Sequence, residues 1–189
     1  MAINLNKASN KKIDLTKHDA TLQNVKAILW WTAPNKFPKF DLDVSAFCLA
    51  NTEKGPKLVD EDWFIFYNNE QSPNKAIVKT PDEKSGGTEE LTINIASLLP
   101  SIEEISLVVT IHKATERGQN FGQIEEAGIK IVNADTNEEI AFYDLDADYG
   151  SECSLQVGSF FKSGTEFSFQ AIGVGYNLEL GDFVEGYTS

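Results

Sequence analysis

The feature that most constrains the fold is a succession of short apolar runs separated by turn-forming residues, without any sustained helical periodicity. The run Asp41–Ala50 alternates in polarity, so that one face of a strand would carry Leu42, Val44, Ala46 and Cys48. Glu104–His112 has the composition of a central strand. Many runs of this length are typical of an antiparallel β-sandwich. We expect an all-β fold of two sheets, with one or two short helices in the connections, such as a helical turn at Ala96–Pro100.

Other stretches fit the same pattern. Val25–Trp31 and Trp63–Tyr67 are apolar runs that predict buried strands. Ser163-Gly164 separates two further runs and predicts a hairpin between Cys153–Lys162 and Thr165–Val174. Leu178–Val184 is interpreted as a last edge strand.

The length of 189 residues predicts a single domain covering residues 1–189. No segment approaches the roughly eighteen apolar residues of a membrane span. The first residues lack the apolar region of a secretory signal, and the chain has only two cysteines, Cys48 and Cys153, both in apolar runs. We expect buried free thiols and a cytoplasmic protein without direct membrane insertion.

The charge of the chain restricts its partners. The formal net charge is −13, which opposes binding to nucleic acid, to anionic lipid and to an oxyanion such as tellurite. Between Asp41 and Glu90 there are eleven acidic residues and five lysines, a net charge of 5 − 11 = −6. This concentration of carboxylates favours cations as ligands.

Two pairs of aspartates precede apolar runs with a spacing of two residues. Asp41 and Asp43 share one face of a strand, and Asp60 and Asp62 do the same if that segment is extended. Close like charges are unfavourable unless water or a cation screens them, and hard oxygen ligands suit Ca²⁺. The alternative is that these acids are simply solvated at strand ends, where Asp and Asn also mark turns. The spacing does not match an EF-hand loop.

Geometry suggests which of these residues can meet. In an antiparallel hairpin, Asn68 and Asn69 would lie near Asp41 and Asp43. Asp60 and Asp62 would then lie at the far end of the second strand, too distant for the same cation unless the turn folds back.

Several motifs together resemble the TerD family of tellurite-resistance and stress proteins. They are the segments Phe40–Phe47, Phe64–Asn69, Val109–His112, Arg117–Gly122, Tyr143–Leu145 and Ala171–Tyr176, which follow the family's order over nearly the whole chain. The resemblance implies a β-sandwich that binds Ca²⁺ through acidic loops, in a cytoplasmic bacterial protein. By resemblance, the loop holding Asp82, Glu89 and Glu90 completes the site, and Asp144 and Glu152 match family positions. Solvation in a loop is the alternative role for the last two.

Three classes of function remain. The first is a non-enzymatic, calcium-binding stress-response protein that acts through ordered loops and meets other stress-resistance proteins. The second is a metal-free β-sandwich interaction module. The third is a hydrolase with paired carboxylates, but the sequence contains no nucleophile elbow, phosphate-binding glycine loop or Cys-x-x-Cys motif. His112 has no second His or Cys at ligand spacing, so we expect it to be packed or hydrogen-bonded.

Overall fold

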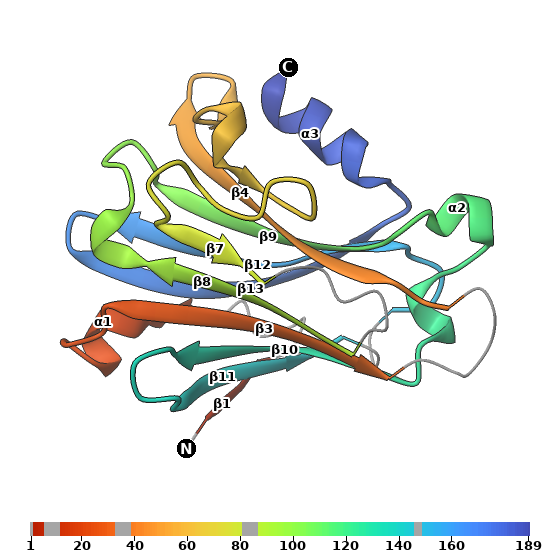
Figure 1. Ribbon diagram of the computed structural model, residues 1–189, viewed down its shortest axis with the longest axis horizontal. Helices are drawn as coiled ribbons and strands as arrows, with labels where there is room; N and C mark the ends of the chain where they lie inside the picture. Colours follow the sequence, from red (N-terminus) through yellow and green to blue (C-terminus); the bar gives the residue numbers. More distant parts are fainter. Residues whose placement is uncertain (1, 6–11, 33–38, 81–86, 146–148) are drawn as a thin grey trace.

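The computed structural model describes residues 2–5, 12–32, 39–80, 87–145 and 149–189, and it consists of two packed β-sheets (Figure 1). The first sheet has the strand order β1 (Ile3–Leu5), β11 (Glu139–Asp144), β10 (Glu126–Asn133), β3 (Asn24–Thr32), β8 (Thr88–Asn94) and β7 (Ile77–Lys79). The second has the order β2 (Lys12–Asp14), β13 (Glu166–Tyr176), β12 (Ser154–Ser163), β9 (Glu104–Ile111), β4 (Leu42–Thr52) and β5 (Gly55–Leu58), and β6 (Phe64–Ile65) also pairs with β4. We call these sheet A and sheet B.

Among the described residues, the strand pairs are antiparallel except for β1 and β11, which run parallel with Ile3 opposite Ala141. The predicted β-sandwich is therefore confirmed. The hairpin at Ser163-Gly164 is also confirmed, because β12 and β13 pair from Ser163 opposite Glu166 onward and Gly164 has a φ of 60°. That left-handed conformation favours glycine in the turn.

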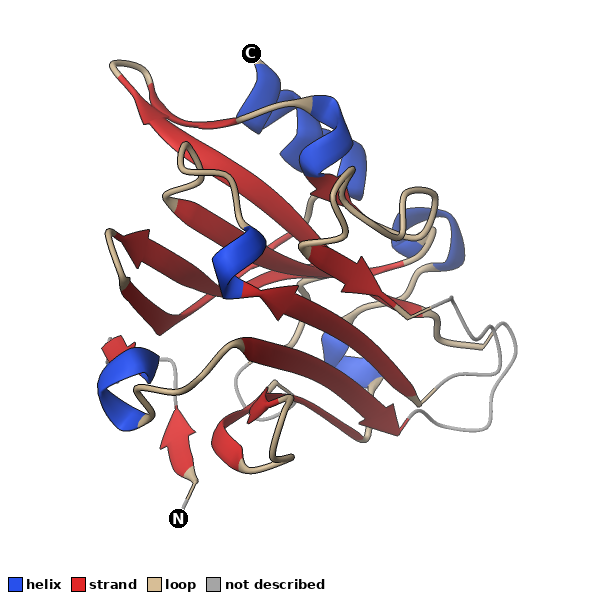
Figure 2. Ribbon diagram, turned by 60° about the vertical axis from the view of Figure 1, so that its left-hand side comes forward, coloured by secondary structure: helices blue, strands red, loops and turns tan. Residues whose placement is uncertain are grey.

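Short helices join and cover the strands (Figure 2). The α-helices are α1 (Leu15–His18), α2 (Ala114–Arg117) and α3 (Leu180–Thr188), and the 3-10 turns are η1 (Glu61–Trp63), η2 (Ile95–Ser97) and η3 (Phe121–Gln123). None of the helices in the described parts of the chain is long and apolar enough to cross a membrane.

Strand β4 separates two apolar clusters. Its residues Leu42, Val44, Ala46 and Cys48 face sheet A and belong to the main core between the sheets. Phe47 and Leu49, on the opposite face, pack with Phe183 of α3 in a second cluster on the outside of sheet B. The alternation predicted for this strand is present, and a helix rather than solvent covers part of its outer face.

Two of the predicted strands are wrong in whole or in part. Leu178–Val184 is not an edge strand, because Leu180, Phe183, Val184 and Tyr187 recur at helical spacing and place one face of α3 on sheet B. Within Trp63–Tyr67 only Phe64 and Ile65 pair with β4. Asp60 accepts a hydrogen bond from the amide of Asp62 and so begins the turn η1.

The chain crosses from sheet B to sheet A directly after β6. Phe66 and Asn69 exchange two backbone hydrogen bonds of 3.0 Å, which reverse the chain direction. Further on, the amide of Lys79 donates to the carbonyl of Glu70 at 2.7 Å. Strands β7 and β8 therefore lie beside β6 and β4, and one side of the sandwich is closed.

Candidate functional site

Most of the acids predicted as ligands gather at one end of the sandwich. Here β4 and β8 begin and β11 ends, on the right of Figure 1. The residues at this end are Asp41, Asp43, Glu89, Glu90, Asp144 and Glu152. They do not share one surface, however, because they point to different faces of the two sheets.

Glu89 lies inside the sandwich and is bound to a lysine. Its Oε1 lies 2.6 Å from Nζ of Lys79, and Oε2 accepts a hydrogen bond of 2.7 Å from the amide of Val44. The Lys79 side chain is 0% exposed and that of Glu89 is 2% exposed. A buried ion pair is tolerated only when its remaining hydrogen-bonding capacity is satisfied, and the amide of Val44 contributes to this. The pair therefore connects β7 and β8 of sheet A to β4 of sheet B.

Glu90 lies on the opposite face of β8, at the outside of sheet A. Its Oε2 is 2.9 Å from Nζ of Lys26 on the neighbouring strand β3. Both predicted ligands of β8 thus form an ion pair with a lysine. A cation at either carboxylate would compete with an ammonium group already present.

Asp144 and Glu152 flank the connection from β11 to β12. Asp144 is exposed at the last position of β11. Glu152 is half-buried, and its Oε2 accepts hydrogen bonds of 3.0 Å from the amides of Gly150 and Ser151. Glu152 therefore organises its own turn, whereas Asp144 faces solvent. Asp82, the remaining predicted ligand, lies outside the described residues.

Asp43 occupies a different environment, on the outer face of sheet B. The residue is only 3% exposed and lines a cavity of about 190 Å³. Register places Asp43 opposite Thr110 on β9, and the first residues of α3 form another wall. Other lining side chains are those of Tyr67, His112, Lys113 and Glu179. The residues that line the cavity thus include two with carboxylates, Asp43 and Glu179, and two with hydroxyl groups, Tyr67 and Thr110.

The cavity is held together by contacts from three directions. Glu179 accepts hydrogen bonds from the amide and hydroxyl of Thr115, at 3.1 and 2.7 Å, which link α3 to α2. The ring of His112 packs edge-on against Tyr67 with centroids 5.9 Å apart, as expected for a packed residue. The backbone amide of His112 donates to the carbonyl of Asp41 at 2.8 Å, which fixes the start of β4.

Asp60, Asp62, Asn68 and Asn69 belong to the folded-back segment described above. The side-chain amide Nδ2 of Asn69 donates to the backbone carbonyls of Phe64 and Asp62, at 2.8 and 3.3 Å. The turn therefore does bring Asn69 back towards Asp62, whereas neighbouring Tyr67 reaches the Asp43 cavity. Within the described ranges, no three His, Cys, Asp or Glu side chains are grouped closely enough to hold a metal ion. The complete ligand set stays a prediction.

Sequence reasoning missed Thr110 and Glu179 as neighbours of Asp43. Thr110 follows from the β4–β9 register once Asp43 and the strand Glu104–Ile111 are paired. Glu179 precedes a helix, and its amide donates to the Asp182 carboxylate at 2.7 Å, so the Glu-x-x-Asp spacing was an available signal.

Both cysteines are free and buried, as expected. Burial raises the pKa of the Cys48 thiol far above its ordinary value. Burial also raises the pKa of Cys153, and the nearby carboxylate of Glu179 raises it further. Both thiols are therefore kept in the protonated, weakly nucleophilic form.

The fold and the site together define an acidic β-sandwich in which most of the predicted ligand acids lie at one end of two packed sheets. The TerD domain family model matches residues 1–187, so the chain belongs to the TerD family.

Curated relatives cover nearly the whole chain. General stress protein 16U of Bacillus subtilis (strain 168) is 36% identical over 95% of this chain and 95% of its own. Tellurium resistance protein TerD of Serratia marcescens is 37% identical over 93% and 92%, respectively. A solved structure of a homologue of telluride resistance protein (TerD) from Streptomyces coelicolor A3(2) has a TM-score of 0.69 at 20% identity, covering 89% of this chain and 99% of its own. That structure supports the fold alone.

The buried ion pair gives the first prediction. Lys79→Met leaves the Glu89 carboxylate buried without its counter-charge, so we expect a loss of about 3–5 kcal/mol in the free energy of unfolding. Lys130→Met is the matched control, because Lys130 and Glu139 form a cross-strand pair of 3.0 Å whose side chains are 42% and 34% exposed. The free energy of unfolding of this control variant, measured in urea, should fall by less than about 1 kcal/mol. Equal losses in the two variants would contradict the role given to Lys79.

The thiols give the second prediction. At pH 8 the native protein should react with an aromatic disulfide reagent at least about tenfold more slowly than the denatured chain, because both thiols are buried and protonated. Cys153, which lies nearer the surface, should account for the residual native reaction, so Cys48→Ser should leave that rate unchanged. A rapid native reaction of two thiols would show that they are accessible.

Proposed function

We propose that this chain is a non-enzymatic, calcium-binding stress-response protein, whose bound cation orders the loops at one end of the sandwich and which acts through partner proteins. The observation that carries the proposal is the buried carboxylate of Asp43. It lies in a cavity with further oxygen atoms, at the end of the molecule where Asp41 precedes β4. Membership of a family with stress and tellurium-resistance proteins supports the biological role.

The donor chemistry fits a hard cation at this position. Asp41 and Asp43 would hold Ca²⁺ through carboxylate oxygens, and the hydroxyl groups of Tyr67 and Thr110 are further oxygen donors within the cavity. The cation would supply positive charge that joins the start of β4 to the adjoining loops. Glu89 and Glu90 fit this role less well, because Lys79 and Lys26 already neutralise them. We therefore propose Asp41 and Asp43 as the principal ligands.

One observation favours a metal-free β-sandwich interaction module instead. Lys113 lines the Asp43 cavity, and α3 directs the positive end of its dipole towards the same space. These two features stabilise a carboxylate without a metal ion. The calcium titration below distinguishes the two functions directly.

A role as a direct tellurite reductant is disfavoured by the thiol environment. Reduction of an oxyanion by cysteine requires accessible thiolates, whereas both thiols here are buried and have raised pKa values. The net charge of −13 also repels an anion. We therefore place the proposed function in calcium-dependent protection rather than in tellurite chemistry.

Isothermal titration with Ca²⁺ and Mg²⁺ tests the proposal. We expect Ca²⁺ to bind at least about tenfold more tightly than Mg²⁺, because carboxylate and hydroxyl oxygens form a flexible site of high coordination number. Asp43→Asn removes one ligand charge at nearly constant shape and should weaken Ca²⁺ binding about tenfold or more. Glu53→Gln, at the exposed β4–β5 turn, is the charge-matched control and should stay within about twofold of the parent.

Three results would contradict the calcium assignment. They are an absence of saturable binding, equal affinities for the two cations, and an Asp43→Asn variant that binds like the parent. The first would favour the metal-free module, and the second a diffuse acidic surface.

A further inference from the structure

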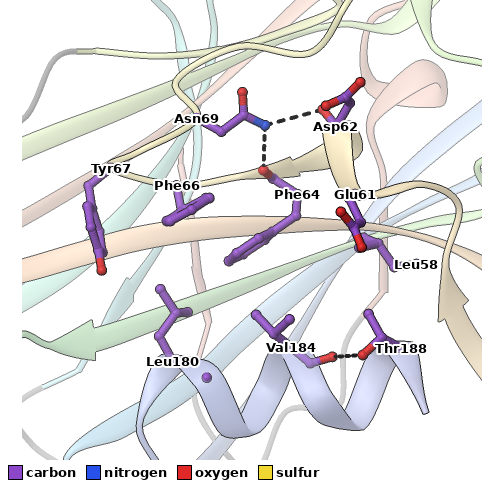
Figure 3. A pocket seen from close by; sticks show the side chains of 11 residues that line it. Leu58, Glu61, Asp62, Phe64, Phe66, Tyr67, Asn69, Leu180, Val184 and Thr188 are labelled. Atoms are coloured by element: carbon purple, nitrogen blue, oxygen red, sulfur yellow. Dashed lines mark hydrogen bonds between the residues drawn. The ribbon is translucent and has the colours of Figure 1, made fainter.

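An open groove of about 620 Å³ lies between α3 and the segment 58–69 (Figure 3). Leu180 and Val184 project from α3 towards Phe64 and Phe66 on the opposite wall. All four side chains are apolar, and Leu180, Val184 and Phe66 are only half-buried. The groove therefore exposes apolar surface in a concave shape, as ligand and peptide sites do.

The aromatic wall of the groove packs on strand β4. Phe64 stacks on Phe47 of β4 and on Phe66, with both centroid distances at 4.4 Å. Phe47 is fully buried under α3, and its ring centroid lies 4.9 Å from that of Tyr187. This stack fixes the wall before any ligand arrives, which lowers the entropic cost of binding.

One end of the groove is strongly anionic. Asp60, Glu61 and Asp62 are consecutive exposed acids, and the carboxyl-terminal end of α3, with its negative dipole, lies at the same end. In the described chain, Lys57 is the one basic residue lining this end, and its ammonium donates to the carbonyl of Gly186 at 3.0 Å. Apolar surface beside this negative charge is complementary to an apolar side chain followed by Lys or Arg.

The length of the groove limits its occupant. The nine residues of α3 span about 13 Å, which matches about four residues of an extended chain. A second copy of this chain is opposed by the net charge of −13 on each molecule.

We propose that the groove binds a segment of a partner protein that carries apolar side chains next to lysine or arginine. This proposal rests on the proposed function, because it specifies how the protein would bind a partner. It does not depend on calcium binding. The groove borders the Asp43 cavity at Tyr67 and Leu180 but uses separate carboxylates.

The experiment uses two labelled peptides of equal charge, three repeats of Leu-Lys-Lys-Leu and three repeats of Ser-Lys-Lys-Ser, titrated into the full chain by fluorescence anisotropy. Titration in excess EDTA keeps a failure of the calcium proposal separate from a failure of this one. The Leu-containing peptide should bind saturably with one site and at least about tenfold more tightly than the Ser-containing peptide. Amide chemical shift changes should concentrate in residues 58–69 and 180–188.

Variants separate the apolar and ionic contributions. Val184→Ser should weaken binding of the Leu-containing peptide about fivefold, because part of the apolar wall is lost. Glu61→Gln combined with Asp62→Asn should weaken binding of the same peptide by a similar factor. This loss should be larger at low salt, where charges are screened less. The matched control is Glu125→Gln combined with Glu126→Gln, which removes the same charge at exposed neighbouring positions at the start of β10 and should have less than a twofold effect.

Several outcomes would overturn the proposal. They are equal binding of the two peptides, equal effects of the two double variants, shift changes spread over the acidic surface, and an absence of saturable binding. Sedimentation that detects a dimer lost in Val184→Ser would assign the groove to a second copy of the chain instead.

Discussion

The arrangement of this sandwich depends on the buried ion pair between Lys79 and Glu89. The two charges lie 2.6 Å apart without solvent exposure of the ammonium group, and the carboxylate also binds the amide of Val44. One interaction thus joins β7, β8 and β4 across the two sheets. Because an unpaired buried charge is costly, sliding of sheet A against sheet B at this side is opposed. The start of β4, with Asp41 and Asp43, is held at a defined position next to that connection.

The same interaction divides the acidic residues by role. Glu89 faces the interior and contributes to the structure, Glu90 pairs with Lys26 outside sheet A, and Asp43 faces a cavity outside sheet B. Acids that are neighbours in sequence or in space can therefore have different functions, because a strand turns successive side chains to opposite faces. This division is the reason for assigning the proposed cation to Asp41 and Asp43 rather than to the whole acidic stretch.

Period-two alternation identified β4, which has its two faces in two different apolar clusters. Continuous apolar runs identified β3 and β9, and the Ser163-Gly164 turn identified the β12–β13 hairpin. The alternation also predicted that Asp41 and Asp43 share a face. The prediction of an edge strand at Leu178–Val184 is wrong because Leu180, Phe183 and Val184 have helical spacing and pack together on sheet B. The contact between Lys79 and Glu89 was not predictable from the local sequence pattern. Nothing in the sequence around Lys79 distinguishes it from an exposed lysine, and its burial depends on how the two sheets pack.

An amide NMR titration with Ca²⁺ tests the central claim most directly, since it locates the cation relative to the ion pair. We predict saturable shifts of the Asp41, Asp43 and Thr110 amides, whereas the amide of Lys79, bonded to the carbonyl of Glu70, stays unchanged. Largest shifts at Lys79 and in β8 would place the cation at Glu89 and contradict the account. So would a spectrum that does not change with Ca²⁺.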